Sequence, residues 1–165
     1  MTRKLTRCAL FAAMMALCAW IAIPLGYTVF TMQTFAVLLA LGVLGGKRGT
    51  VSILCYLLLG VVGLPVFSSF QGGIAALLGP TGGYLWGFML TGLVYWGLEA
   101  WGRAPAMIAG LLTCYACGAA WYMVYTGGGL VPVLMQTVLP YLIPDAVKLS
   151  LALKIAKRLK NTTVL

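Results

Sequence analysis

The chain of 165 residues consists of long apolar runs that end at Pro, Gly or basic residues. Six such runs can be delimited, at residues 5–23, 33–46, 50–64, 84–98, 104–125 and 145–159. They do not alternate between apolar and polar positions, as the strands of a membrane β-barrel do. A helix that crosses a bilayer needs about 20 mostly apolar residues. The pattern therefore predicts an all-α, polytopic membrane protein with six transmembrane helices in one domain, residues 1–165, the short second run being tilted or partly re-entrant.

Composition supports this class and excludes two others. Apolar residues make up 62% of the chain and charged residues only 8%, whereas a soluble domain carries about 25% charged residues. So few charges cannot solvate the surface of an ordinary cytosolic enzyme. The net charge of +9 does not indicate nucleic-acid binding either, because such binding needs basic residues on a wetted face.

The basic residues predict the orientation in the membrane. With six spans, ten of the eleven Lys and Arg residues fall on one side: Arg3, Lys4, Arg7, Lys47, Arg48, Arg103, Lys154, Lys157, Arg158 and Lys160. Because cytoplasmic loops carry the Lys/Arg excess, we expect both termini to be cytoplasmic in a bacterial cell membrane. The alternative interpretation of the basic residues near the C-terminus is a tail that binds a partner. The N-terminus also resembles a signal peptide, but the run is long and more spans follow, so we expect an uncleaved helix.

Tryptophan prefers the two interfaces of a bilayer. Trp20 and Trp121 would lie near the outer interface, and Trp96 and Trp101 near the inner one. The loops on the outer side, residues 24–32, 65–83 and 126–144, contain no charge and are rich in Gly, Pro and aromatic residues. Because irregular backbone at membrane depth is tolerated where it lines a cavity, we hypothesise that these loops cover one.

Asp145 and Lys148 are the two charges on the wrong side. Residues three apart share a helix face, and Pro144 suits a first helical turn. We therefore expect both on the first turn of the sixth helix, where the dipole favours an acid. One interpretation is a capping acid paired with a lysine. The other is a ligand site, since ionisable residues in membrane segments are commonly functional, for a small solute with both a urea or amide group and a carboxylate.

Further polar and glycine residues near the outer ends of the runs are candidates. Gln33 and Thr81 need hydrogen-bond partners in apolar surroundings. Tyr84 and Tyr141 each offer a ring and a hydroxyl, as pocket walls or as interfacial tyrosines. Glycine lets the backbone approach a ligand or another helix closely, and loop geometry is the alternative role for these glycines: Gly72, Gly73, Gly79, Gly82 and Gly83.

Three motifs, in order along the chain, resemble the BioY family, the biotin-specific substrate-binding (S) components of energy-coupling factor (ECF) transporters. The central motif comprises Gly63-Leu64-Pro65-Val66-Phe67-Ser68, Gly72-Gly73 and Gly79-Pro80-Thr81-Gly82-Gly83-Tyr84-Leu85. It is flanked by Met32-Gln33-Thr34-Phe35 and by Pro144-Asp145-Ala146-Val147-Lys148. The resemblance covers essentially the whole chain.

The resemblance implies a six-helix membrane protein that captures biotin from outside with high affinity. It would deliver the vitamin inward when docked to a transmembrane coupling protein (T component) and two ATPases. It also implies that Asp145 accepts hydrogen bonds from the ureido N–H groups, and that Lys148 either orients Asp145 or binds the carboxylate. The other implied biotin contacts come from the motifs: Gln33, Ser68, Gly72, Gly73, Thr81, Gly82, Gly83 and Tyr84.

The helix expected at residues 5–23 offers a docking surface, because small residues every four positions allow another helix to approach closely. Ala9 and Ala13 resemble the Ala-x-x-x-Ala pattern with which S components face the coupling protein. Ala12 and Ala16 form a second pair with the same spacing. The alternative role for these alanines is helix packing within the chain. Glycine and lysine at 45–49 lack the P-loop spacing, so ATP hydrolysis would need partners.

Neither catalysis nor a bound cofactor is expected. The five cysteines lie in apolar runs, and the chain has no histidine to complete a zinc site. The sequon at Asn161 falls on the cytoplasmic side. Biotin is thus expected as transported ligand, with no cofactor, metal or nucleic acid. Two other functions stay open: a membrane-integral enzyme that uses Asp145 and Lys148 as an acid–base pair, and a passive channel subunit.

Overall fold

The computed structural model describes residues 2–25 and 28–162. This part of the chain forms eight α-helices, two 3-10 helices and one pair of strands. The α-helices are α1 (Thr2–Trp20), α2 (Gln33–Leu44), α3 (Gly46–Val61), α4 (Ile74–Leu78), α5 (Gly82–Leu98), α6 (Arg103–Thr126), α7 (Leu130–Thr137) and α8 (Leu139–Thr162). The remaining elements are β1 (Ala22–Leu25), β2 (Thr28–Thr31), η1 (Ser68–Phe70) and η2 (Glu99–Trp101).

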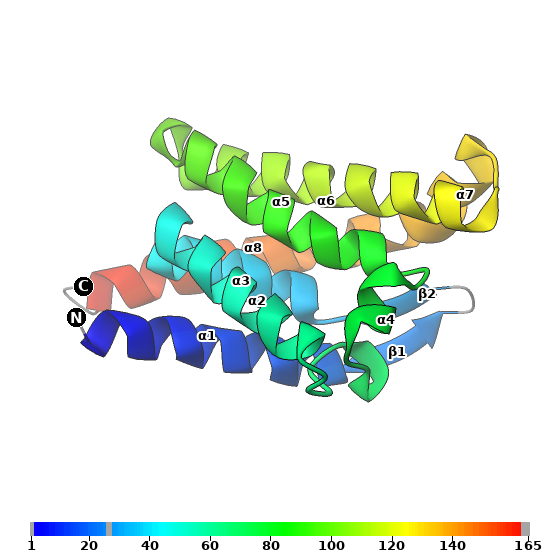
Figure 1. Cartoon of the computed structure of the whole chain (residues 1–165). Coiled ribbons are helices and arrows are strands. Elements are labelled where there is room, and N and C mark those ends of the chain that lie inside the picture. The colour runs from blue at the N-terminus through cyan, green and yellow to red at the C-terminus, as the bar shows by residue number, and fades with distance from the viewer. Residues whose placement is uncertain (1, 26–27, 163–165) are drawn as a thin grey trace.

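The long helices lie alongside one another and give the molecule two distinct ends (Figure 1). The start of α1, the turn between α2 and α3, η2 and the end of α8 lie at one end, on the left in Figure 1. We call it the basic end, because the Lys and Arg residues of these segments are there. The strands, α4 and α7 lie at the opposite end, which we call the cavity end.

The described chain is mostly helical, as the expected all-α class requires, but it also contains a hairpin that the sequence does not predict. β1 and β2 pair antiparallel, with Ala22 opposite Thr31 and Leu25 opposite Thr28. The sequence predicts a helix end and a loop there. Residues 28–31, Thr-Val-Phe-Thr, are β-branched or aromatic and favour extended backbone. Two stretches predicted as loops also contain short helices, α4 and α7.

The start of α8 is a second correction. The sequence predicts a helix that begins after Pro144, but α8 begins at Leu139 and contains this proline. Proline inside a helix removes one backbone hydrogen bond, here the one to the carbonyl of Pro140. Asp145 is therefore the seventh residue of α8 instead of lying in its first turn. The dipole effect falls off within the first turn, so it does not account for an acid at this position.

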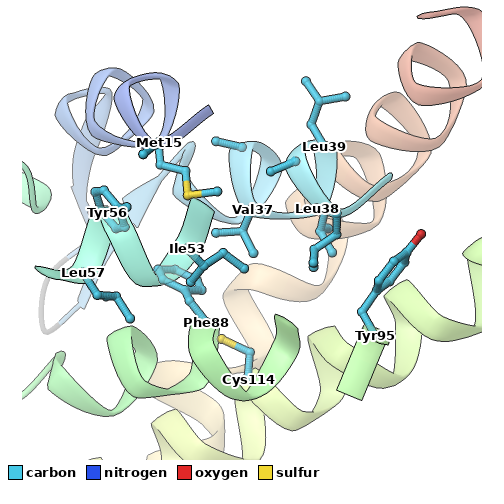
Figure 2. Packing of buried hydrophobic residues seen from close by; sticks show 14 of the residues in the cluster. Met15, Val37, Leu38, Leu39, Ile53, Tyr56, Leu57, Phe88, Tyr95 and Cys114 are labelled. Atoms are coloured by element: carbon cyan, nitrogen blue, oxygen red, sulfur yellow. The ribbon is translucent and has the colours of Figure 1, made fainter. Parts of the chain in front are cut away.

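The core is built around α2. Seven consecutive residues of this 12-residue helix are buried, from Ala36 to Gly42. A helix that is apolar on all sides is a buried helix, and α2 packs against α1, α3, α5 and α8. Figure 2 shows Val37 and Leu38 of α2 among Met15 and Ile53. The second apolar run is thus the centre of the bundle.

Large apolar side chains cover the outside of the bundle. Among those exposed on its long helices are Leu54, Leu58, Leu90, Leu93, Ile108, Leu112, Leu151 and Ile155. Soluble monomers rarely expose apolar patches larger than a few hundred Å², so this surface is typical of one that faces lipid. Among the described residues, α6 is long and apolar enough to cross a membrane alone, and α7 with α8, bent by 41°, would form a second such segment.

Candidate substrate-binding site

A cavity at the cavity end is enclosed by residues from all three uncharged stretches and from four long helices. Its lining residues are Val29, Thr31, Gln33, Thr34, Phe67, Ser68, Gln71, Ala76, Thr81, Tyr84, Leu85, Phe88, Cys114, Tyr115, Tyr141, Asp145 and Lys148. Six of the ten residues expected to contact the ligand are in this set. The hypothesis that the uncharged stretches cover a cavity agrees with this arrangement.

Asp145 and Lys148 form a buried ion pair in the wall of the cavity. Lys148 Nζ lies 2.7 Å from Asp145 Oδ1, and the two side chains are 4% and 3% exposed. The hydroxyl of Tyr115 donates to Asp145 Oδ2 at 2.7 Å. Lys148 Nζ also donates to the carbonyl oxygen of Thr31 at 2.7 Å. Each charged group therefore has hydrogen bonds beyond the ion pair, which a buried charge requires.

Aromatic rings complete the surroundings of the ammonium group. Lys148 Nζ lies 4.0 Å from the ring centroid of Phe30, within the range of a cation–π interaction. Phe30 in turn stacks on Tyr141, with ring centroids 6.4 Å apart and planes 5° apart. β2 thus contributes a ring and a backbone carbonyl to the same lysine. The hairpin is held to α8 by this contact.

Gln33 is the second buried polar group of the cavity wall, at 5% exposure. The hydroxyl of Thr31 donates to Gln33 Oε1 at 3.1 Å. Gln33 Nε2 donates to the hydroxyl of Tyr56 on α3, and this hydroxyl donates to the carbonyl of Val66 at 3.1 Å. The amide therefore joins β2, α2, α3 and the segment after α3.

Tyr84 contributes to the cavity from α5. Its hydroxyl donates to the carbonyl of Thr137, at the end of α7. A Cβ atom at Gly118 of α6 would collide with the ring of Tyr84, so this ring packs directly on the backbone of α6. Thr81 precedes α5 and accepts the backbone N–H of Tyr84 at 3.0 Å. Ser68 lies in η1 and lines the cavity from the segment after α3.

Four expected contact residues lie outside the lining of the cavity: Gly72, Gly73, Gly82 and Gly83. A Cβ atom at Gly82 would collide with the carbonyl of Leu77, and one at Gly83 with the side chain of Trp121. Gly73 has φ +84°, a backbone conformation that favours glycine. Gly72, Gly82 and Gly83 thus allow close packing around the cavity, whereas Gly73 provides a left-handed backbone conformation. A role of these four glycines in ligand contact stays a prediction.

The sequence did not single out Tyr115, Tyr56, Phe30 or Thr31. Thr31 and Phe30 directly precede the Met32-Gln33 motif, but their contact with Lys148 spans more than 100 residues. Tyr115 and Tyr56 stand in apolar runs, where each hydroxyl needs a partner. The need for a hydrogen-bond partner could have marked both tyrosines as candidates, although it does not reveal which partner each of them has.

Comparisons with known proteins relate this geometry to a family. The family model of the BioY family matches residues 1–164. The chain belongs to the BioY family. It is 41% identical over 168 residues to the biotin transporter BioY of Thermotoga maritima, and 39% identical over 161 residues to the probable biotin transporter BioY of Pyrococcus horikoshii. Each alignment covers 98% of both chains.

A solved structure extends the likeness to the fold. The crystal structure of the S-component for biotin from an ECF-type ABC transporter matches with a TM-score of 0.89 at 27% identity. The match covers 97% of this chain and 92% of that chain. The family expected from the motifs is confirmed.

The two registers of alanines on α1 of this BioY chain lie in different surroundings. Ala12 and Ala16 are buried in the bundle, whereas Ala9 and Ala13 are exposed. Ala12 and Ala16 therefore pack within the chain, and Ala9 and Ala13 leave a strip of small residues on the surface. No group of three or more His, Cys, Asp or Glu that could hold a metal occurs in residues 2–25 and 28–162.

Proposed function

We propose that this protein is the biotin-binding S component of an ECF-type uptake transporter. The observation that carries the proposal is the buried Asp145–Lys148 pair in an otherwise largely apolar cavity. Its support is the membership in the BioY family and the likeness to the biotin S-component. Nothing in the cavity favours the enzyme over the binding role, since both charged groups are engaged with each other.

Biotin matches the chemistry of this cavity. Its ureido N–H groups are donors, and a carboxylate has about four acceptor sites, of which Asp145 uses two for Lys148 and Tyr115. The bicyclic ring and the valerate chain are apolar and would contact Phe67, Phe88 and Leu85. Lys148 Nζ lies 2.7 Å from Asp145 Oδ1, so Lys148 would orient the Asp145 carboxylate, and the valerate carboxylate, at the other end of biotin, would lie away from this pair. Gln33, Ser68, Thr81 and Tyr84 are the further polar contacts, with the glycines of the central motif behind them.

The proposal includes six membrane spans, α1, α2, α3, α5, α6 and α8, in a bacterial cell membrane. α4 and α7 are short and lie at the cavity end. The basic end would be cytoplasmic, with both termini, because cytoplasmic segments carry the Lys/Arg excess. Trp20 and Trp121 support this orientation, since their indole N–H groups donate to Pro65 and Gly79, both in an uncharged stretch at the cavity end. Biotin would then enter from outside.

Delivery inward needs partners. The chain carries no P-loop, so a T component and two ATPases would supply the energy. Ala9 and Ala13 are the residues that we propose to face the T component, because both are exposed on α1. Small residues allow another helix to approach closely.

The test is biotin binding to the purified protein in detergent, measured by calorimetry. We expect one biotin per chain, released unmodified, with a dissociation constant below 1 μM. Asp145→Asn should weaken binding about 100-fold, because a lost hydrogen bond to a charged group is worth about 1.5–3 kcal/mol. Glu99→Gln is the matched control: this carboxylate accepts from the N–H of Gly46 at the basic end. Binding weaker than micromolar, or equal losses in both variants, would contradict the proposal.

A further inference from the structure

Tyr56 of α3 stands behind the cavity wall, where it connects two segments that form the wall, α2 and residues 65–71. Its side chain is fully buried, with 0% exposure, and it is not among the residues that line the cavity. Its hydroxyl is hydrogen-bonded both to Gln33, which does line the cavity, and to the carbonyl of Val66. A phenol has one hydrogen to donate, so the two bonds must have different directions.

The direction of the whole chain of hydrogen bonds follows from the Val66 carbonyl. A carbonyl oxygen only accepts, so Tyr56 gives its hydrogen to Val66, at 3.1 Å. The phenol oxygen must then accept from Gln33, which places the NH₂ group of the amide toward Tyr56. The amide oxygen consequently lies toward the Thr31 hydroxyl, which donates to it at 3.1 Å. The network thus assigns the two ends of an amide that would otherwise be interchangeable.

This orientation determines what Gln33 can offer to a ligand. A side-chain amide has two N–H donors and two acceptor positions on its oxygen. Tyr56 takes one donor and Thr31 one acceptor position. Within the described residues 2–25 and 28–162, one N–H and one acceptor position of the amide are then left, which suits a ligand that carries a donor and an acceptor side by side, as an amide or a urea does.

The same hydroxyl fixes the segment 65–71, which we call the lid segment. Val66 belongs to it, and so do the cavity-lining residues Phe67, Ser68 and Gln71. The rings of Tyr56 and Phe67 meet edge to face, with centroids 5.6 Å apart and planes 83° apart. One tyrosine therefore contacts both the backbone and the main apolar side chain of the lid segment.

We propose that Tyr56 is a positioning residue of the binding site. It sets the direction of the Gln33 amide toward the ligand and holds the lid segment against the cavity. Naming biotin as the ligand rests on the proposed function, whereas the hold on the lid segment does not. Two measurements therefore separate the two ideas.

The first measurement needs no ligand. Hydrogen–deuterium exchange of the purified full chain, read by mass spectrometry, reports local opening of the backbone. Tyr56→Phe keeps the ring and removes the hydroxyl. We expect at least fivefold faster exchange in residues 62–73 and unchanged exchange in α6. Tyr95→Phe is the control, because Tyr95 is also a buried tyrosine outside the cavity lining, at 2% exposure, but lies near Glu99 and Arg103 of the basic end. Unchanged exchange of the lid segment in Tyr56→Phe would overturn the hold on this segment.

The second measurement is a double-mutant cycle on biotin binding, with Tyr56→Phe, Gln33→Met and the pair. Such a cycle isolates the interaction between two residues. Tyr56→Phe should weaken binding about five- to tenfold, and Tyr95→Phe should not. If Tyr56 acts through Gln33, the double variant binds no more weakly than Gln33→Met alone. Effects that multiply would overturn the orientation of Gln33 by Tyr56. Wild-type protein that does not bind biotin would sink the proposed function, and the exchange experiment would still decide the role of Tyr56.

Discussion

Asp145 and Lys148 place two opposite charges where water hardly reaches them, with side chains 3% and 4% exposed. Removing such charges from water is expensive, and their mutual attraction compensates only with good geometry and further hydrogen bonds. Here Tyr115 and Thr31 supply those hydrogen bonds. Removing one charge of the pair should therefore destabilise the protein more than removing both charges.

This asymmetry gives a prediction on stability. Lys148→Met leaves the Asp145 carboxylate buried without its cation and should destabilise the protein by about 3–5 kcal/mol. The double variant Asp145→Asn, Lys148→Met carries neither charge and should recover most of this loss. Thermal unfolding in detergent measures both variants, and neither should bind biotin.

Lys154→Met is the control for the loss of a lysine, because Lys154 is exposed on the same helix. It should leave both the melting temperature and biotin binding unchanged. If the double variant were as unstable as Lys148→Met, the ion pair would not be the source of the effect.

At the scale of single residues, the sequence revealed Asp145 and Lys148 but not the residues that surround them. Two charges three residues apart in an apolar run are conspicuous because lipid makes them costly. The residues that compensate them belong to β2 and α6, and such contacts depend on how distant segments pack. The same holds for Tyr56, whose partner Gln33 lies 23 residues away on another helix.

The lid segment, residues 65–71, has an unusual backbone conformation. Ser69 and Phe70 have φ values of 56° and 58°, a left-handed conformation that non-glycine residues rarely adopt. Surrounding contacts hold it: the indole of Trp20 donates to Pro65 at 2.8 Å and lies against the ring of Phe70, with centroids 5.1 Å apart. The ring of Phe67 in this segment packs directly on Gly60 of α3, where an added Cβ atom would collide with the ring.

Gly60→Ala tests this packing. In an unobstructed helix interior, alanine is more stable than glycine by about 0.5–1 kcal/mol. Here the added methyl group would push Phe67, which is 1% exposed, out of its place, and overpacking costs about 1–3 kcal/mol. We expect the clash to prevail, with a lower melting temperature and weaker biotin binding because Phe67 lines the cavity.

Gly97→Ala is the matched control, since a Cβ atom at Gly97 of α5 would meet nothing within 4 Å. This variant should melt at the same or a higher temperature and bind biotin normally. A stabilising Gly60→Ala would show that the lid segment adapts without loss.

The elements that were predictable are those decided by long apolar runs. The centres of the long helices followed from these runs, because lipid demands satisfied backbone groups. The hairpin, α4 and α7 did not, since short elements of uncharged Gly- and Pro-containing sequence depend on what they pack against. Pro144 was a misleading signal: it resembles a helix start, yet α8 continues through it.

The proposed binding site and the proposed docking surface lie apart along the length of the molecule. The strands, α4 and α7 lie at one end of the bundle (Figure 1), where residues 29–34, 67–81 and 141–148 contribute to the cavity lining. The segments that carry the other described Lys and Arg residues lie at the opposite end. α1 runs between the two, with Ala12 and Ala16 inside and Ala9 and Ala13 outside. Neither exposed alanine belongs to the cavity lining. Binding and docking should therefore be separable by substitution.

Ala9→Trp and Ala13→Trp should abolish biotin uptake and leave biotin binding intact. A bulky ring on the exposed strip of α1 would prevent close approach of a partner helix, while the bundle interior is untouched. Uptake of radiolabelled biotin is measured in cells that also produce the T component and the ATPases, and binding is measured on the purified variants. Ala116→Trp, at an exposed alanine of α6, controls for a tryptophan on the lipid-facing surface and should transport normally. Full uptake by both α1 variants would place the docking surface elsewhere, and loss of binding would mean that α1 also shapes the cavity.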